Sequence, residues 1–359
     1  MRQVISQVTA KIGPSLLKEM HLVETSEAMR EIQKKKLASS AEKAGCELHW
    51  HDDIDRISPS PAFSMVVAHE FFDALPFYLL QQTQPDEWRE VMIASALDPI
   101  KDPRSHPTPE SDANSVSSGT PTPPEGLQQG HIYPRLRRVL SPEPTPASIG
   151  MSRLSPRFKE LPPSSFLEVS PVSFYKARVL ATLLGSSSSP PKAAVEDPVG
   201  ATSGTDPGTT NGGGCGLIID YGDAKAFGDS FRASIRAFKD HKIVDVFDRP
   251  GQCDLTTNVD FKLLQEAMGD FVTTHGPITQ QDFLSRMGIA LRVEALARKA
   301  ETKERSTAIW AAADRLVDPA GMGKEYKIMA FTSFRGAGME DSKEKKILPY
   351  PFDLEVQNS

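Results

Sequence analysis

Apolar positions along the chain follow two periods, one typical of strands and one typical of helices. Continuous apolar runs at Phe63–Ala68 and Gly216–Asp220 predict strands that are buried on both faces. Apolar residues at helical spacing predict helices over Ser26–Ala44 and Pro171–Leu184. Further strands are predicted at Met20–Val23, Cys46–Trp50, Lys242–Phe247 and Tyr326–Phe331, a hairpin at Phe77–Gln81 and Trp88–Ile93, and further helices at Phe261–Gly269, Gln280–Met287 and Val293–Leu316.

The order of these elements indicates the fold class. Strands that alternate with helices predict a doubly wound α/β fold, with a mostly parallel sheet and helices on both faces. In such sheets, ligands bind beyond the carboxyl ends of the strands. Glu24, Asp53, the pair His69 and Glu70, and Asp220 each follow a predicted strand closely. We therefore expect these side chains to lie along one edge of the sheet and to form a site there.

Composition divides the chain into ordered and disordered parts. Many of its 29 prolines lie in 98–163 and 186–214, two stretches rich in Ser, Pro, Gly and Thr. Such stretches bury too little apolar surface to offset the entropy of ordering their backbone. We therefore expect one α/β domain in three pieces (1–97, 165–185 and 215–334), separated by disordered inserts at 98–164 and 186–214 and followed by a tail at 335–359.

Charge, cysteines and hydropathy exclude several classes of function. A net charge of -6 argues against a nucleic-acid-binding surface, and the basic run Arg135–Arg138 lies inside the first insert. The cysteines, Cys46, Cys215 and Cys253, form no CxxC pair, and no two histidines have metal-site spacing, so no metal is predicted. No apolar run approaches the roughly 20 residues of a membrane span. No GxSxG follows a strand, so a hydrolase elbow is not predicted either.

Two of the acids that follow strands have the right chemistry for a nucleoside. A carboxylate such as Glu24, at the end of its strand, can accept hydrogen bonds from both ribose hydroxyls. Asp53, after the next strand, can bind an adenine amino group or a second hydroxyl. Each acid also has a simpler interpretation, because Glu24 precedes Thr25 and Ser26 as a helix cap would, and Asp53 lies in the polar turn HDDID.

The stretch HEFFDALP, His69–Pro76, is more specific. Glu70 and Asp73 are three residues apart, so a helical turn would place both carboxylates on one side, with Phe71 and Phe72 toward the core. Two acids near an apolar wall can bind a guanidinium through charge-assisted hydrogen bonds and can accept a proton from it. The alternative is a capped loop whose aromatic rings simply pack against the sheet.

HEFFDALP resembles the (N/H)EFFDALP signature of the MidA-like methyltransferases, a family that includes a mitochondrial complex I assembly factor. The resemblance continues in the family's order along nearly all of the ordered chain. It includes HLVETSEAMREIQ (His21–Gln33), DEWRE (Asp86–Glu90), IIDYG (Ile218–Gly222), FKDHKIVDVF (Phe238–Phe247), PGQCDLTTNVDF (Pro250–Phe261), GPITQQDFLSRMGI (Gly276–Ile289) and LVDPAGMGKEYKIMAF (Leu316–Phe331).

The resemblance implies a Rossmann-like methyltransferase that uses S-adenosyl-L-methionine, dimethylates a protein arginine symmetrically and takes part in assembling mitochondrial complex I. Glu24 matches the family's ribose-binding acid and Asp53 the acid after the third strand, and His69 is expected on the cofactor side. We expect Glu70 and Asp73, the acids of the signature, to hold the substrate arginine. His241 and Asp254–Asp260 lie in family motifs and are candidates for the substrate side.

One part of the family pattern has no counterpart here. The family's ELGPGRGT-type glycine loop precedes the strand that ends at Glu24, whereas this chain begins with MRQVISQ. The glycine-rich Asn211–Gly216 comes before its strand and is interpreted as linker. We therefore expect a fold without its first strand and glycine loop, and a chain that is unstable or inactive as written. The alternative function is a non-catalytic assembly or scaffold protein that keeps the fold and binds its partner in the same cleft.

Overall fold

A five-stranded mixed sheet lies at the centre of the molecule. The computed structural model describes residues 16–95, 136–185, 212–224, 234–240, 242–247, 250–333 and 349–353. Strands β3 (Ser64–His69) and β12 (Val259–Asp260) both pair in parallel with β8 (Gly214–Asp223). On its other edge β8 pairs antiparallel with β14 (Tyr326–Ser333), which in turn pairs antiparallel with β13 (Val272–Thr279).

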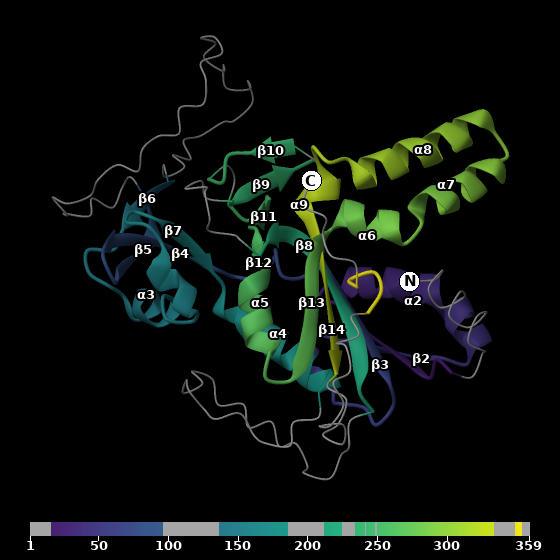
Figure 1. Ribbon diagram of the computed structural model, residues 1–359, viewed down its shortest axis with the longest axis horizontal. Coiled ribbons are helices and arrows are strands. Elements are labelled where there is room, and N and C mark those ends of the chain that lie inside the picture. The colour runs from purple at the N-terminus through teal and green to yellow at the C-terminus, as the bar shows by residue number, and fades with distance from the viewer. Residues whose placement is uncertain are drawn as a thin grey trace, which may run out of the picture.

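Helices cover both faces of this sheet, as the sequence predicted. Helices α4 (Pro171–Leu184) and α5 (Phe261–Met268) lie side by side on one face (Figure 1), where Met329 and Phe331 of β14 share their apolar core. Alternate residues of β14, Ile328 and Ala330, point to the opposite face. There they pack in a second apolar cluster with Phe283 of α6 (Gln280–Arg286).

A helical hairpin extends from this second face. The single helix predicted over Val293–Leu316 is two helices, α7 (Ile289–Arg298) and α8 (Lys303–Val317), and the short α9 (Met322–Glu325) follows them. Thr302 caps α8 by accepting a hydrogen bond from the backbone N–H of Arg305 at 3.1 Å, which explains the break. None of the described helices combines the length and the apolar character that crossing a bilayer requires.

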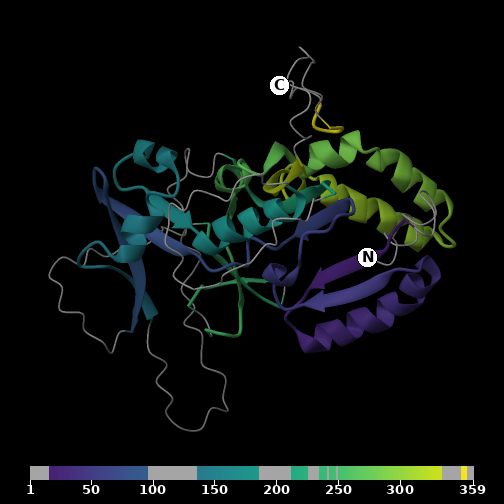
Figure 2. The same ribbon diagram turned by 90° about the horizontal axis from the view of Figure 1, so that it is seen from below.

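A small parallel layer, β1 (Glu19–Val23) and β2 (Glu47–His51), lies beside the main sheet with α2 (Glu27–Ala44) against one face (Figure 2). Ser26 caps the start of α2 and the left-handed Gly45 (φ 62°) its end, close to the predicted bounds. Met20 and Leu22 of β1 pack under α2 in an apolar cluster of their own. Among the described residues, β1 pairs only with β2, and β3 only with β8. The expected absence of a first strand stays a prediction.

An antiparallel lobe follows β3 along the chain, with strand order β6-β5-β4-β7. The predicted hairpin is β4 (Tyr78–Gln84) with β5 (Glu87–Ser95), and β6 (Leu136–Leu140), α3 (Pro146–Met151), the 3-10 turn η2 (Pro156–Glu160) and β7 (Phe166–Val169) complete the lobe.

The expectation of disorder over 98–164 is wrong for its described part, residues 136–164. Val139 and Phe158 are buried there, and two of the prolines that suggested disorder, Pro146 and Pro156, occupy first-turn positions of α3 and η2. Proline suits such positions, because the first-turn N–H has no partner within the helix.

The prediction of a mostly parallel sheet is also wrong. All pairs in the antiparallel lobe and in the small sheet of β9 (Arg236–Lys239), β10 (Lys242–Val244) and β11 (Asp254–Thr256) are antiparallel. Hairpins need only short connections, so antiparallel pairs form wherever the chain turns back on itself. The fold is therefore α/β with mixed sheets.

Two predictions about the central strands also need correction. The run Phe63–Ala68 forms β3 but is not buried on both faces, since Met65 and Val67 are 65% and 68% exposed. The glycine-rich stretch is not all linker, because β8 begins at Gly214. An added Cβ at Gly216 would lie 2.2 Å from Cζ of Phe331, so the missing side chain lets that ring pack on the strand.

Candidate active site

An acidic cleft of about 320 Å³ opens beyond the carboxyl ends of the parallel strands β3 and β8. Sheet β9–β10–β11 lies above β8 at this end (Figure 1). This is where ligands bind in α/β sheets of this kind. The cleft is lined by Glu70 and Asp73 from the turn after β3, Tyr221 from β8, Phe238 and Asp240 at the end of β9, and Asp254 and Thr256 from β11.

The turn that carries Glu70 and Asp73 is held by a buried carboxylate on β8. Oδ2 of Asp220, which is fully buried, accepts hydrogen bonds from the backbone N–H groups of Phe71, Phe72 and Asp73 at 3.2, 3.0 and 3.4 Å. The HEFFD segment is therefore a turn rather than the predicted helical turn, with Glu70 in the left-handed region (φ 48°). Phe72 is buried in the core beneath it, as predicted. Asp220 thus positions both acids of the signature.

Asp73 is the most informative side chain in the cleft. It is only 5% exposed, and its Oδ1 is buried with no hydrogen-bond partner in the described structure. Burial raises the pKa of its carboxyl, and the nearby acids Glu70 and Asp254 raise it further. Thr256, 6% exposed, likewise has an unpartnered buried Oγ1 in the same cleft. Unpartnered buried polar atoms are costly, so this arrangement is suited to a bound ligand that donates hydrogen bonds and carries positive charge.

A tyrosine hydroxyl binds Glu70, the other acid of the signature. The Tyr326 hydroxyl donates a hydrogen bond to Oε1 of Glu70, and the ring of Tyr326 lies 4.1 Å from that of Tyr221, centroid to centroid. Burial and the bond to Glu70 raise the pKa of Tyr326, so it stays a proton donor. The Tyr221 ring already has a cation over its face, because the Arg236 guanidinium lies 5.3 Å from the centre of the ring.

Glu24 and Asp53, the two acids at the β1–β2 rim of the sheets, have partners within the chain, whereas Oδ1 of Asp73 has none in the described structure. Glu24 directly follows β1 and supports the start of α2: Oε1 accepts the N–H of the cap residue Ser26 at 2.9 Å, and Oε2 accepts from the Gln33 amide at 3.1 Å. Asp53 accepts the Asp55 N–H at 3.1 Å and binds Lys176 Nζ at 2.6 Å. Burial raises the pKa of Asp53, but the hydrogen bond and charge of Lys176, together with the backbone N–H bonds to the carboxylate, outweigh it, and the net pKa is lowered.

Of the five residues predicted for the site, Glu70 and Asp73 line the cleft, whereas Glu24 and Asp53 do not. The fifth, His69, ends β3, is exposed and stacks at 6.5 Å on Tyr326. Asp254 was expected on the substrate side and does line the cleft, but His241 lies outside the described residues.

Sequence reasoning missed Tyr221, Phe238 and Asp240. Tyr221 had an available signal, because it directly follows Asp220 at the carboxyl end of a buried strand.

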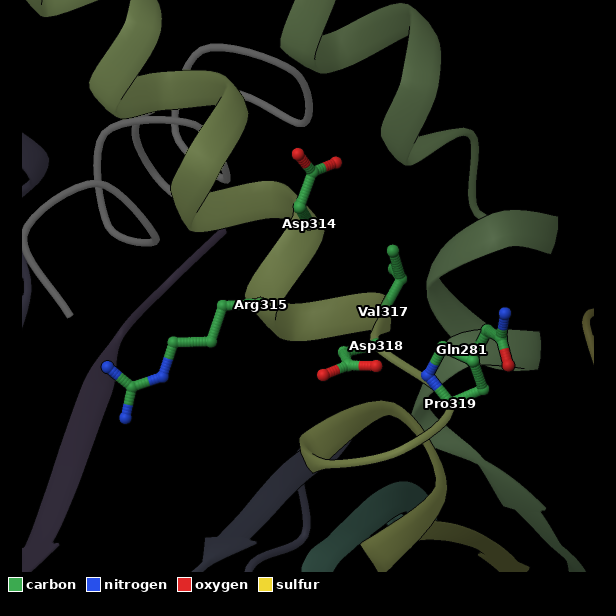
Figure 3. Close-up of a pocket in the computed structure, with 6 residues that line it drawn as sticks. All are labelled: Gln281, Asp314, Arg315, Val317, Asp318 and Pro319. Carbon is green, nitrogen blue, oxygen red and sulfur yellow. The ribbon is translucent and has the colours of Figure 1, made fainter.

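A larger hollow, about 460 Å³, lies on the helical side of the molecule (Figure 3). Its lining side chains come from α6, from α8 and from the turn after α8, and Arg315 extends away from the others in Figure 3. Asp314 and Asp318 line it without the buried unpartnered atoms that mark the acidic cleft. The described structure therefore gives no chemical reason to place the active site here.

The rim acids can still hold the adenosine part of a nucleoside cofactor. The hydrogen bonds from the Asp55 N–H and from Lys176 both go to Oδ1 of Asp53, so its carboxylate keeps acceptor capacity for a ligand. Each Glu24 oxygen accepts one bond, although a carboxylate has about four acceptor positions. Both acids follow the carboxyl ends of strands, and their remaining acceptor capacity suits ribose hydroxyls and an adenine amino group.

Known proteins are similar to this chain in sequence and in fold. Residues 1–278 match the family described as "Putative S-adenosyl-L-methionine-dependent methyltransferase". The chain is 28% identical to the Danio rerio protein named "Protein arginine methyltransferase NDUFAF7, mitochondrial" over 99% of this chain and 71% of that one. The Homo sapiens protein of the same name is 27% identical over 91% of this chain and 62% of that one. The chain spans 52% of the Xenopus tropicalis protein.

A solved structure supports the fold. A COG1565 superfamily member from Burkholderia thailandensis, bound to S-adenosyl-homocysteine, superposes with a TM-score of 0.61 at 18% identity, over 92% of this chain and 67% of that one. This similarity concerns the fold alone. The family match covers well over half of the sequence and agrees with the motifs from HEFFDALP to IIDYG. The chain belongs to the family of S-adenosyl-L-methionine-dependent methyltransferases.

Proposed function

We propose that this protein transfers a methyl group from S-adenosyl-L-methionine to an arginine of a protein substrate, which binds in the acidic cleft. The observation that carries the proposal is Asp73, whose buried Oδ1 has no partner among the described residues and lies in a cleft that also holds Glu70, Asp240 and Asp254. A guanidinium offers five N–H donors and a permanent positive charge, which fits this set of acceptors.

The residues of the cleft have separable roles in this proposal. Asp73 and Glu70 bind the guanidinium, and their negative charge favours the cation that methylation of a guanidinium nitrogen produces. Tyr326 and Asp220 hold these two acids in place. The raised pKa of Asp73 suits it to accept the proton that the guanidinium loses. When bound, the cofactor supplies the electrophilic methyl group.

Alignment of the reacting groups accounts for much of the rate in such a transfer. Methyl transfer is an in-line displacement that needs little covalent help from the protein, so holding the nucleophile in the correct direction lowers the barrier. The aromatic side chains Tyr221 and Phe238 line the cleft and restrict the plane of a bound guanidinium.

The finer parts of the proposal come from the relatives. The Danio rerio and Homo sapiens relatives are named as mitochondrial protein arginine methyltransferases. We extend that location and substrate class to this chain, together with the symmetric dimethylation and the role in complex I assembly that the family resemblance implies. The family match favours this enzymatic hypothesis over a non-catalytic scaffold.

The test compares two aspartates in the full chain. Asp73→Asn keeps the shape of the side chain but removes its charge, and we expect it to lower methyl transfer about 100-fold or more, in the range for loss of one charge-stabilising group. Asp314→Asn, in the hollow on the helical side, is the matched control and should leave the rate unchanged. The rate is measured as labelled methyl incorporated into mitochondrial protein, with the modified arginine identified by mass spectrometry.

Cofactor binding separates the two halves of the proposal. Calorimetry with S-adenosyl-homocysteine should give the same affinity for Asp73→Asn as for the wild-type chain, since Asp73 is assigned to the substrate. Methylation that survives Asp73→Asn and Glu70→Gln would contradict the assignment of the cleft. Absence of saturable cofactor binding by the wild-type chain would contradict the methyltransferase proposal itself.

A further inference from the structure

The face of the β1–β2 layer that points away from α2 carries a cluster of metal-binding side chain types. Along β1 the apolar Met20 and Leu22 pack under α2, so Glu19 and His21 point to the opposite side. The register of the parallel pair sets His21 directly across from His49, and Glu19 across from Glu47. The cluster is thus built from two strands that are far apart in sequence, which explains why spacing along the chain did not reveal it.

The side chains of this cluster are close enough to share one ion. Glu19, His21 and His49 each offer a ligand atom, and these atoms lie within 4.8 Å of one another. Nε2 of His21 lies 3.2 Å from Oε2 of Glu19, and the rings of His21 and His49 stack 4.9 Å apart, centroid to centroid. Zinc bonds to nitrogen and oxygen of about 2.0–2.2 Å would draw the three atoms somewhat closer. Side chains at an exposed strand face can make that adjustment by rotation.

A fourth residue orients the central histidine. Nδ1 of His21 lies 2.9 Å from Nε2 of His51. Histidine ligands of metals typically use one ring nitrogen for the metal and donate the N–H of the other to a neighbouring acceptor, which fixes the tautomer. His51 is placed to be that acceptor, because its ring also lies 5.2 Å from that of His21, centroid to centroid. His21 is then held with Nε2 toward Glu19.

The chemistry of this donor set indicates the class of ion. Imidazole nitrogens suit zinc, copper and nickel, and a single carboxylate is compatible with each of them. Hard cations such as Ca²⁺ and Mg²⁺ prefer oxygen ligands throughout. We propose that Glu19, His21 and His49 bind one divalent transition-metal ion, with the remaining coordination positions open to water. This site lies on a different layer from the acidic cleft and is independent of the proposed methyl transfer.

The test uses the untagged full chain, stripped of metal with a chelator and titrated with Zn²⁺ by calorimetry at pH 7.5. We expect one equivalent to bind. His21→Ala and His49→Ala should each weaken binding at least about tenfold, since even outer-shell changes typically cost about 10- to 100-fold. His51→Ala should weaken it to a smaller extent. His69→Ala removes an exposed histidine on another strand and is the matched control, so its affinity for Zn²⁺ should equal that of the wild-type chain.

Two further measurements make the result specific. Co²⁺ substituted for Zn²⁺ should give visible absorption bands whose intensity falls in His21→Ala. Because the ligands come from both β1 and β2, Zn²⁺ should also raise the melting temperature of the wild-type chain but not that of the double variant His21→Ala/His49→Ala. The proposal is overturned if the wild-type chain shows no saturable Zn²⁺ binding, or if the double variant binds with unchanged affinity.

Discussion

Asp73 in the cleft and the acids of the β1–β2 rim, Glu24 and Asp53, differ in whether their carboxylate oxygens already have partners within the protein. Glu24 and Asp53 have partners within the chain: Glu24 accepts the N–H of Ser26, the cap residue of α2, and Asp53 binds Lys176. Asp73 is more deeply buried than either, yet one of its oxygens has no described partner. All three acids follow strands in the sequence. Position after a strand therefore predicts where an acid lies, whereas burial and partners indicate which acid is kept for a ligand.

The largest expected effect concerns Asp220, on which the cleft side of this comparison depends. Asp220→Ala leaves three backbone N–H groups of the HEFFD turn without their acceptor. Each buried unsatisfied donor costs about 1–3 kcal/mol, so we expect the free energy of unfolding to fall by roughly 3 kcal/mol or more. Urea denaturation measures this change. Asp220→Asn retains an acceptor oxygen and should cost less; an equal loss in both variants would show that the charge, not the acceptor, matters.

The dependence of stability on pH should have opposite signs in the two regions. Burial and neighbouring Asp73 raise the pKa of Asp220 from 3.8 to about 7. Between these values the folded state binds more protons than the unfolded state, so this group's stabilising contribution is lost as pH rises toward 7. Asp53, whose pKa is lowered, behaves in the opposite way and loses its contribution as pH falls.

This contrast is tested by measuring the free energy of unfolding from about pH 4 to about pH 8, which spans the ordinary and the raised pKa of Asp220. The curve of Asp220→Asn should decline less steeply with rising pH than the wild-type curve. Parallel curves for the two proteins would contradict the raised pKa.

A smaller effect is expected from the ion pair of the rim. Lys176→Met keeps the buried stem of the side chain and removes the ammonium that binds Asp53 and Asp55 at 2.6 and 3.0 Å. The Asp53 side chain is 45% exposed and can be rehydrated, so we expect a loss of only about 1 kcal/mol. Thermal unfolding of Lys176→Met measures this loss of stability, with Lys159→Met, which changes a lysine of η2, as the control. A loss as large as that of Asp220→Ala would remove the distinction between the two regions.

The smallest change in stability is expected at Glu24, where the two interpretations of the residue separate. Glu24→Ala removes the acceptor of the Ser26 N–H at the start of α2 and should cost about 0.5–1 kcal/mol, in the range for loss of a single hydrogen bond. If Glu24 also binds ribose, affinity for S-adenosyl-homocysteine should fall by about tenfold, the equivalent of roughly 1.4 kcal/mol. Calorimetry and thermal unfolding of one variant give both numbers. Lost stability with unchanged affinity would show that Glu24 only supports the start of α2.

Local sequence signals predicted much of the scaffold. Helices α2 and α4 and the hairpin β4–β5 lie close to their predicted ranges, because caps and apolar period are properties of short segments. The apolar run at Phe63–Ala68 correctly predicted a strand but not its exposure, which depends on which neighbours cover it. The antiparallel partners of β8 and β14 could not be inferred either, since pairing depends on topology.

The site was predicted only in part, for the same reason. The sequence identified Glu70 and Asp73 through the signature motif, and it placed Asp220 at the same edge of the sheet. Phe238 and Asp240 line the cleft from β9 and the residue after it, which belong to a separate small sheet. No local sequence pattern indicates that β9 lies over the end of β8. That Oδ2 of Asp220 binds three consecutive N–H groups is a feature of the folded turn, which became visible only in three dimensions.

The separate apolar cluster beneath α2 has a consequence for how the molecule opens. Leu22, Leu37 and Ala44 pack with one another and not with the main core under α4 and α5. Regions with their own small cores tend to exchange their amide protons through local opening rather than through global unfolding. Amides of β1, β2 and α2 should therefore exchange with solvent deuterium faster than those of β8 and β14, and as one cooperative unit. A metal ion bound across His21 and His49 would slow exchange in this unit selectively.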